Sequence, residues 1–351
     1  MKLTIIAIAC ITATLTACGG GGGGSSTTVP SQTTPTTSFS LTAKVDGAAV
    51  NNFVVNSGEA KVLGLTTGQE VEITTSAPSV LVSKSFGKAT ADVRSETSTV
   101  FRAMLTSTDH TTAKLVFALA TDPTKVATVT LTIRGTNPNF AAVTPIKGDA
   151  FTYAENDKRL DGVPVTFPDS THLVTAVDSA TGNWTEQYIN PPNVVMSNVN
   201  FNAQGNRVGY QATAADPNGC KDARFEPEEK LLVFPLTVNG TYSGSWTTRC
   251  LPSDSQIETL TATVKAYEQI TTRGGVFNAL RIEQITKVTN STDVRLPGRG
   301  YEQTVTVWFD PILGRNVKYS GVRSYPNGMP TDPSQFLSET NIELINTVKS
   351  Q

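Results

Sequence analysis

The chain has 351 residues, with 28 Lys and Arg against 30 Asp and Glu and a formal net charge of −2 at pH 7. No basic patch stands out against this near-neutral balance. We therefore do not expect nucleic acid as a partner, nor a polybasic contact with a membrane surface. The length predicts two folded units, and a chain rich in Thr, Val and Ser without a long 3.6-residue period predicts an all-β protein.

Residues 1–17 have the pattern of a lipoprotein signal peptide. Lys2 gives a basic start, and an apolar run of about 13 residues follows, which is too short to span a bilayer as a permanent helix. The run closes on Leu15-Thr16-Ala17-Cys18, which resembles a lipobox. The resemblance implies that Cys18 carries a diglyceride and, after cleavage, an N-linked acyl chain such as palmitate. Two or more chains hold a protein on a membrane where a single chain does not.

Residues 18–38 are predicted to be the lipid anchor and a flexible tether. The Gly, Ser, Thr and Pro residues after Cys18 bring almost no apolar side chains, so they cannot bury enough surface to offset the entropy of ordering. Gly19, rather than Asp, follows Cys18, so no inner-membrane retention signal is evident. We therefore expect the protein at the outer membrane, on its periplasmic face or at the cell surface.

Residues 39–135 are predicted to form an antiparallel β-sandwich. Strict apolar alternation begins at Phe39, and Asp46-Gly47 has the composition of a turn. Further strands are expected near 61–65, 70–75, 80–86, 99–105, 114–120 and 126–134. In the last two, the residues expected to face inward are Leu115, Phe117, Leu119, Val129, Leu131 and Ile133, and those expected to face solvent are Thr128, Thr130 and Thr132.

Two short motifs in this unit resemble bacterial Ig-like domains. The stretch from Asp122 to Ile133 is similar to their closing hairpin, and Gly68-Gln69-Glu70-Val71-Glu72-Ile73 is similar to their second strand. The resemblance implies a spacer or adhesive module, and it transfers no catalytic residue to this chain.

Residues 136–148, rich in turn-forming residues, are predicted to be a linker, and residues 149–351 a larger curved antiparallel sheet, a half-barrel. Hairpins are expected over 173–189 and 194–212. Long strands are expected over 242–249, 257–270, 276–289, 301–309, 316–325 and 341–348. Asp332-Pro333 has the composition of a short helix start. Because few apolar residues of the linker remain to hold the units together, residues 145–351 are expected to fold alone.

Three segments of this second unit resemble half-barrel domains akin to the outer-membrane lipoprotein carrier fold. They are Phe234-Pro235-Leu236 with Gly240 and Trp246, then 275–283, then 307–317 around Asp310-Pro311. Some relatives of that fold bind acyl chains. If this unit is a carrier, the strand face of Leu260, Ala262, Val264 and Ala266 should enclose an open cavity. If it binds its partner on the outer surface instead, Trp184, Trp246 and Trp308 should fill that space.

Cys220 and Cys250 are predicted to form a disulfide. Cys10 leaves with the signal peptide and Cys18 is the acylation site, so these two remain as a pair in an oxidising compartment. A redox-active pair is the alternative, but the Cys-x-x-Cys spacing typical of such pairs is missing.

Few other residues have the spacing of a site. His110 and His172 are the only histidines, and neither has a partner at metal-ligand spacing, so solvent-facing structural roles are expected. Asp216, Asn218 and Asp222 concentrate oxygen ligands in one loop, but their spacing misses the EF-hand pattern and Lys221 lies among them. A solvated loop is therefore expected, and a calcium site is the alternative. We therefore predict no catalytic residue, no cofactor and no firm metal site.

These patterns predict a lipid-anchored, non-enzymatic protein of the cell envelope with a spacer or adhesive module and a half-barrel that binds another envelope protein or a glycan. A carrier for an acyl chain or other apolar ligand is the alternative. An envelope hydrolase is third, because no pair of carboxylates stands out among 30 acids.

Overall fold

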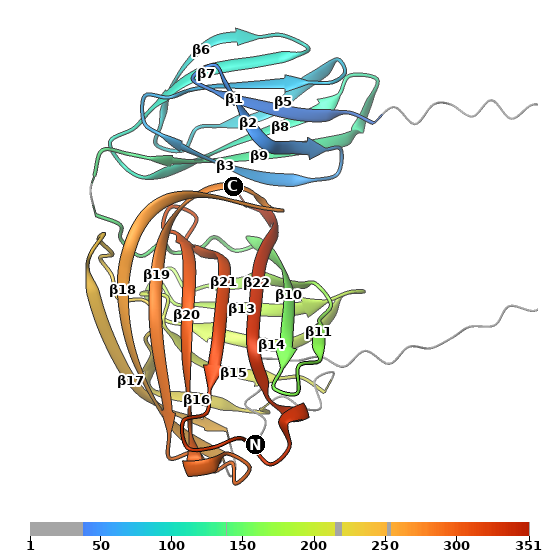
Figure 1. The fold of residues 1–351 in the computed structure, drawn as a ribbon. Coiled ribbons are helices and arrows are strands. Elements are labelled where there is room, and N and C mark those ends of the chain that lie inside the picture. The colour runs from blue at the N-terminus through green and yellow to red at the C-terminus, as the bar shows by residue number, and fades with distance from the viewer. Residues whose placement is uncertain (1–37, 138, 215–219, 251–253, 351) are drawn as a thin grey trace, which may run out of the picture.

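The computed structural model describes residues 38–350, apart from 138, 215–219 and 251–253. This part of the chain is nearly all β-strand, with two short 3₁₀ turns, η1 (Pro297–Arg299) and η2 (Pro333–Gln335). A smaller unit lies over a larger one (Figure 1). None of the described helices has the length and hydropathy needed to cross a bilayer. The predicted all-β class is confirmed.

The smaller unit, here called the sandwich, has two packed sheets. One has the strand order β2-β1-β4-β7-β6, and the other joins β5, β8, β9 and β3. The apolar residues of alternating strand positions meet between the sheets, and all six residues predicted to face inward on the last two strands are buried. The strands are β1 (Ser40–Val45), β2 (Ala48–Asn56), β3 (Ala60–Thr66), β4 (Glu70–Thr75), β5 (Ser79–Ser85), β6 (Thr90–Glu96), β7 (Val100–Thr106), β8 (Thr111–Leu119) and β9 (Asp122–Arg134).

Two strands of the sandwich, β2 and β6, escape prediction from the sequence. They form the two edges of their sheet, and most of their residues are exposed, although β2 buries Phe53 and Val55 in the core. An edge strand that buries little surface needs no apolar alternation, so its sequence carries little strand signal.

The larger unit, here called the barrel, is a closed antiparallel sheet. Its first strand, β10, pairs with both β12 and the last strand, β22, and the short β11 adds to β10. The strands are β10 (Ala150–Arg159), β11 (Pro164–Thr166), β12 (Ser170–Val177), β13 (Trp184–Asn190), β14 (Val194–Phe201), β15 (Arg207–Ala212), β16 (Ala223–Glu229), β17 (Thr241–Cys250), β18 (Asp254–Thr272), β19 (Gly275–Thr289), β20 (Tyr301–Asp310), β21 (Arg315–Ser324) and β22 (Leu337–Val348).

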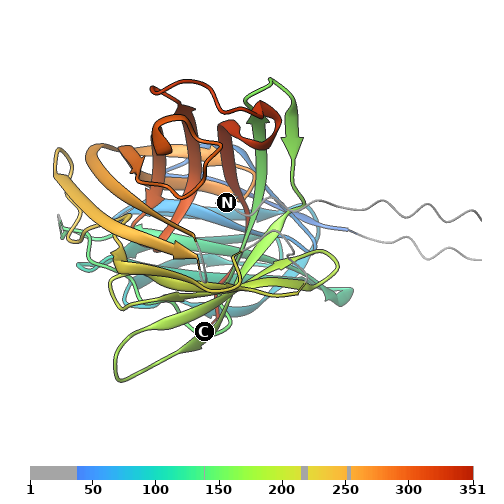
Figure 2. The ribbon, with the colours of Figure 1, turned by 90° about the horizontal axis from the view of Figure 1, so that it is seen from below.

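The expected large curved sheet is therefore present, and it curves further than a half-barrel. Closure depends on pairing between the ends of the unit, such as Ala150 with Val348. Turn motifs predict only the pairing of neighbouring strands, so they do not reveal a contact between residues this far apart in the sequence. In Figure 2, the green to yellow strands β12 to β16 lie opposite the orange to red strands β18 to β22.

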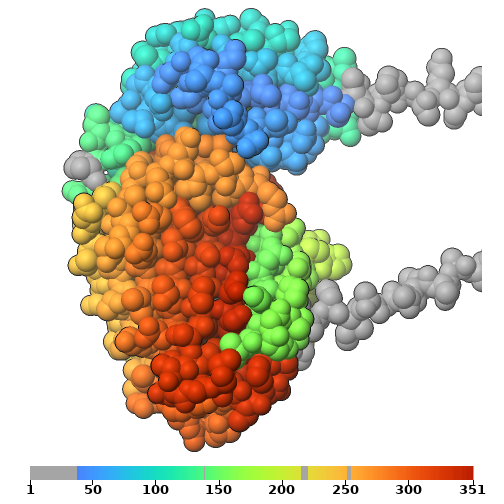
Figure 3. All heavy atoms as spheres, in the orientation of Figure 1, coloured from blue at the N-terminus to red at the C-terminus, as the bar shows by residue number. Residues whose placement is uncertain are grey.

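The sandwich and the barrel meet in a packed seam. Strand β3 pairs in parallel with β19 through Val62 and Gly275. Val62 packs in the barrel core with Phe151 and Phe277, whereas Val276 belongs to the sandwich core. The surface view shows the blue sandwich lying directly on the orange end of the barrel (Figure 3). The two cores are therefore joined through the seam.

Two expectations fail at this seam. Thr130 and Thr132, expected in solvent, are 1% and 0% exposed, because the barrel covers their face of the sheet. The expectation that few apolar residues of the linker hold the units together also fails, since Phe140 packs against the barrel strands and bridges to Leu236. The second unit thus buries part of its apolar surface against residues that precede 145.

Substitution of Gly64 tests how tightly the seam is packed. A Cβ added at Gly64 would lie 2.7 Å from the backbone nitrogen of Asn278 on the barrel, closer than real contacts allow. Gly64→Ala is therefore expected to lower the free energy of unfolding by about 1–3 kcal/mol, the usual range for overpacking. Urea denaturation measures this loss. The control is Gly321→Ala, whose Cβ would meet only side-chain atoms, at 3.0 Å. An equal loss in both variants would contradict a tight seam.

Candidate functional site in the barrel

Most of the predicted site residues do not come together. Cys18, Asp216 and Asn218 lie outside the described residues. Asp222 precedes β16, where Arg224 Nη2 donates to its carboxylate at 3.3 Å. Across the described residues, no group of three His, Cys, Asp or Glu side chains has the arrangement of a metal site. The calcium alternative gains no support from Asp222, and for the other two residues it stays a prediction.

Cys220 and Cys250 are joined by a disulfide, with their Cα atoms 5.6 Å apart. Cys250 ends β17 and pairs with Ala223 at the start of β16. The bridge therefore ties the segment before β16 to the neighbouring strand.

The two histidines make specific contacts instead of facing solvent. His110 stacks on Phe140 with 4.6 Å between ring centroids, and its Nδ1 accepts from the backbone nitrogen of Gly135 at 3.1 Å. His172, on β12, stacks on Tyr188 at 3.7 Å. Burial, together with the charges of Arg315 and Arg207, lowers the pKa of His172 to about 3, so this imidazole is neutral.

Apolar side chains fill one part of the barrel interior. Ala262 and Val264 belong to a buried cluster on β18 to β20 that Phe140, Phe234 and Leu236 cover. A second cluster joins Leu260 to Trp246 and Phe225. Trp184 stacks on Phe201. Trp308 does not take part in this filling, because it pairs with the outward-facing Lys318 on the outer face of the sheet, where its Nε1 donates to Glu268 at 2.9 Å. The apolar surface on which an acyl carrier would depend is thus occupied by the protein's own side chains.

A different part of the interior is polar. On β21, Lys318 and Val322 are exposed on the outside, so the alternate residues Tyr319 and Arg323 face inward. On β10, Asn156 is exposed on the outside, so its neighbour Glu155 faces inward. The other polar groups that alternation and burial place on the inner wall are Asp157, His172, Glu186, Tyr188, Arg207, Glu229, Gln256, Glu258, Tyr301 and Gln303.

We infer that these polar groups line an internal space rather than a solid core. Tyr188, Arg207, Tyr301 and Arg323 are surrounded by protein, and desolvation is the main influence on the pKa of each. Each nevertheless keeps accessible surface, and the Arg207 side chain is 29% exposed. A side chain that is enclosed by a closed sheet and still accessible to water faces an internal space. We call this space the lumen.

Charged pairs hold the walls of the lumen together. Arg315 of β21 lies 2.5 Å from the fully buried Glu186 of β13, on the opposite wall. Arg207 of β15 pairs with Glu229 of β16 and also lies over the ring of Phe225 at 5.1 Å. Pairing of this kind offsets the cost of desolvating each charge.

Glu155 and Asp157 form a carboxyl pair at the end of the lumen away from the sandwich. Desolvation raises the pKa of both groups, and the charge of Asp157 raises that of Glu155 further. Arg323 opposes these shifts only in part. Thr340 Oγ1 donates to Asp157 at 3.4 Å. Two carboxyl groups this close cannot both ionise easily, so the pair retains a proton near neutral pH.

The carboxyl pair predicts how stability depends on pH. Because folding raises the pKa of Glu155, stability is highest below its ordinary pKa and falls as the pH rises through the raised value. Glu155→Gln should remove much of this fall in melting temperature between mildly acidic and alkaline pH. Thermal melts across that range measure it. Glu339→Gln, in an exposed pair with Lys158, is the control and should leave the slope unchanged. An unaltered slope in Glu155→Gln would contradict the assignment.

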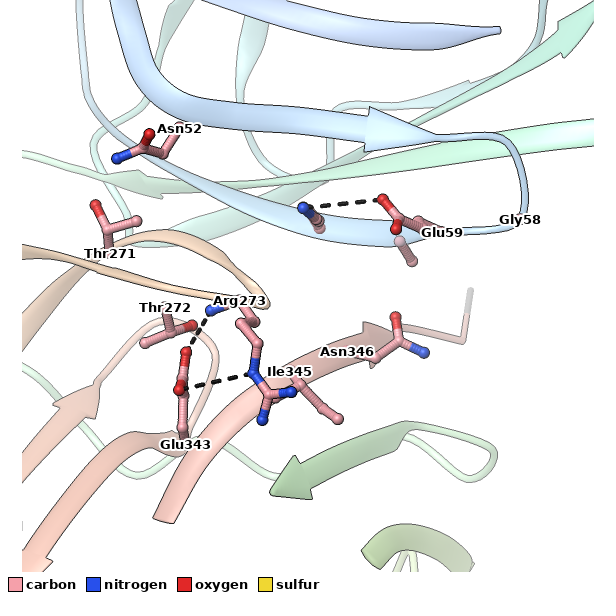
Figure 4. Close-up of a pocket in the computed structure, with 11 residues that line it drawn as sticks. Asn52, Gly58, Glu59, Thr271, Thr272, Arg273, Glu343, Ile345 and Asn346 are labelled. Atoms are coloured by element: carbon pink, nitrogen blue, oxygen red, sulfur yellow. Dashed lines mark hydrogen bonds and ion pairs between the residues drawn. The ribbon is translucent and has the colours of Figure 1, made fainter. Parts of the chain in front are cut away.

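A separate cleft of about 670 Å³ lies between the two units, as Figure 4 shows. Asn52 and Glu59 line it from the sandwich, and Arg273, Glu343 and Asn346 line it from the barrel. Glu343 accepts from the backbone nitrogen of Arg273 at 2.5 Å and lies 3.8 Å from its Nε. The charges of this cleft are therefore paired within the protein, and no aromatic ring stands among its described lining residues. We regard the lumen as the stronger candidate.

Comparisons with known proteins give a limited result. No family model matches the chain, and neither does any curated protein. Among solved structures, one provisionally classed as a lipoprotein, from Parabacteroides distasonis, shares 11% identity at a TM-score of 0.39, with coverage of 60% of this chain and 100% of that one. An exported protein with a YmcC-like fold from Bacteroides fragilis gives 10% identity, a TM-score of 0.29 and coverage of 60% and 100%.

A third solved structure is the hypothetical lipoprotein YmcC from Escherichia coli, with 10% identity, a TM-score of 0.28 and coverage of 60% of this chain and 90% of that one. At these scores the similarities carry no functional argument. They confirm neither the Ig-like resemblance of the sandwich nor the carrier-like resemblance of the barrel.

Proposed function

We propose that this chain is a lipid-anchored, non-enzymatic protein of the cell envelope, held at the outer membrane through Cys18, whose barrel binds a ligand in its lumen. The anchor rests on the lipobox-like sequence before Cys18. The binding role rests on one observation, that polar side chains enclosed by the closed sheet remain accessible to water. In this proposal the sandwich is a fixed cap on one end of the barrel.

The acyl-carrier alternative is disfavoured by the chemistry of the interior. An acyl chain needs a continuous apolar wall, but the apolar residues of β18 to β20 already pack against Phe140, Phe234 and Leu236. The remaining wall carries arginines, acids and tyrosines, whose desolvation by a hydrocarbon chain would be unfavourable.

The lumen is tested with thiol labels at two neighbouring positions of β20. Gln303 is 8% exposed and faces the lumen, whereas Thr304 is exposed on the outside. In a soluble mature chain that carries Cys18→Ser, Gln303→Cys should react with a small methanethiosulfonate and not with a polymer-linked maleimide. Thr304→Cys should react with both. An unreactive Gln303→Cys in folded protein would refute a water-accessible lumen.

The anchor is tested by labelling cells with a palmitate analogue. Wild-type protein should be labelled, and Cys18→Ser should not. Cys10→Ser is the matched control, because Cys10 lies within the predicted signal peptide and should be dispensable. Label on the Cys18→Ser protein would refute the anchor without affecting the proposal for the lumen.

A further inference from the structure

One group of lumen side chains lies at the end of the barrel remote from the sandwich. Strand β10 ends and β22 begins at this end (Figure 1). Both β10 and β21 pair with β22 at Thr340, which brings Asp157 and Gly321 to the same level. Arg323, two residues beyond Gly321, lies within electrostatic reach of Glu155 and Asp157, although more than 160 residues separate it from them in the sequence.

Aromatic rings surround Arg323. Its guanidinium lies 5.0 Å from the ring centroid of Tyr301. The rings of Tyr301 and Tyr325 are 6.1 Å apart at 44°, so they present two differently oriented faces. Burial raises the pKa of both phenols, which keeps them as neutral hydroxyl groups. Tyr301 and Arg323 keep accessible surface in the lumen.

Hydrogen-bonding capacity is left unused at this position. In the described part of the chain, Arg323 Nε has no hydrogen-bond partner. Glu155 and Asp157 hydrogen-bond to each other through the proton that the pair retains. A buried donor or acceptor without a partner lowers the stability of the folded state. A buried donor without a partner, beside a carboxyl pair and tyrosine rings, therefore marks a place that a ligand would complete.

The chemistry of the group restricts the ligand. A free anion would meet the carboxyl pair, a cation would meet Arg323, and an acyl chain would desolvate all three groups. A sugar ring has hydroxyl groups that both donate and accept, together with a C–H face that packs on tyrosine. It matches the open donor, the remaining acceptor sites of the carboxyl pair and the aromatic faces at once.

We propose that the lumen binds a neutral saccharide at its sandwich-distal end, with Arg323, Glu155 and Asp157 bonding its hydroxyl groups and Tyr301 packing on its ring. This inference rests on the proposed binding role of the lumen.

The experiment uses the soluble mature chain with Cys18→Ser on a microarray of neutral and anionic bacterial glycans, with calorimetric titration of each glycan that binds. Neutral glycans should bind. Arg323→Gln should weaken that binding roughly tenfold or more, as expected when hydrogen bonds from a charged donor are lost. Lys318→Gln removes a positive charge from the outer face of the same strand and should leave affinity unchanged.

A second variant separates binding from folding. Tyr301→Phe keeps the ring face and should retain most affinity, whereas Tyr301→Leu should lose it, with melting temperatures reported for both. Absence of any neutral glycan among the ligands, binding of anionic glycans alone, or binding unchanged in folded Arg323→Gln would each overturn the proposal. If Gln303→Cys reacts but no glycan on the array binds, only the saccharide assignment is overturned. If Gln303→Cys does not react, the lumen itself is overturned.

Discussion

A fragment of residues 145–351 is expected to unfold at a much lower temperature than a chain of residues 39–351. Without the sandwich, Val276, Phe277 and Leu313 lose their cover at the seam, and each is 2% exposed or less in the whole chain. Exposing a fully buried apolar side chain costs about 1.5–3 kcal/mol, so the expected loss is several kcal/mol. Circular dichroism melts and urea denaturation of the two chains measure it.

A longer fragment of residues 136–351 provides the matched comparison. It keeps Phe140, which is 2% exposed and packs on the barrel strands. It should therefore be more stable than 145–351 and less stable than the whole chain. Equal melting temperatures for all three would show that the seam contributes little, and would restore the expectation that the second unit folds alone.

Removal of the disulfide is the second change with a large expected effect. Cys220 and Cys250 are 30 residues apart, and closing a loop of that length stabilises by about 3–4 kcal/mol on the chain-entropy model. The double variant Cys220→Ser with Cys250→Ser should lose that much in urea denaturation. Reduction of the parent protein should reproduce the loss. Alkylation of unreduced protein, followed by mass spectrometry, checks the bond directly, and alkylation of both residues would contradict it.

Sequence patterns were sufficient where an interaction is local. Alternation in Leu115, Phe117 and Leu119 placed a buried strand face correctly, because every second residue of a strand shares a face. The hairpins β12 to β13 and β14 to β15 were also expected at these positions, since their turns carry Gly and Asn.

The polar lumen left a weak signal that could have been followed. On β20 and β21, alternate positions hold Tyr301, Gln303, Tyr319 and Arg323 on the face that the barrel turns inward. A strand with polar residues on both faces looks like a solvated strand, so its inner face cannot be distinguished until the partner strands are known. Expecting His172 in solvent was wrong for the same reason.

By itself, the sequence determined the all-β class, the strand faces within each hairpin and the pairing candidates among the cysteines, because these depend on side-chain periodicity and residue counts. Only the tertiary structure decided that β10 closes the sheet against β22, that β3 joins the sandwich to the barrel, and that Glu155 and Arg323 share a lumen. These contacts join residues far apart in the chain, and their energy comes from burial and from completed pairing, which no local pattern records.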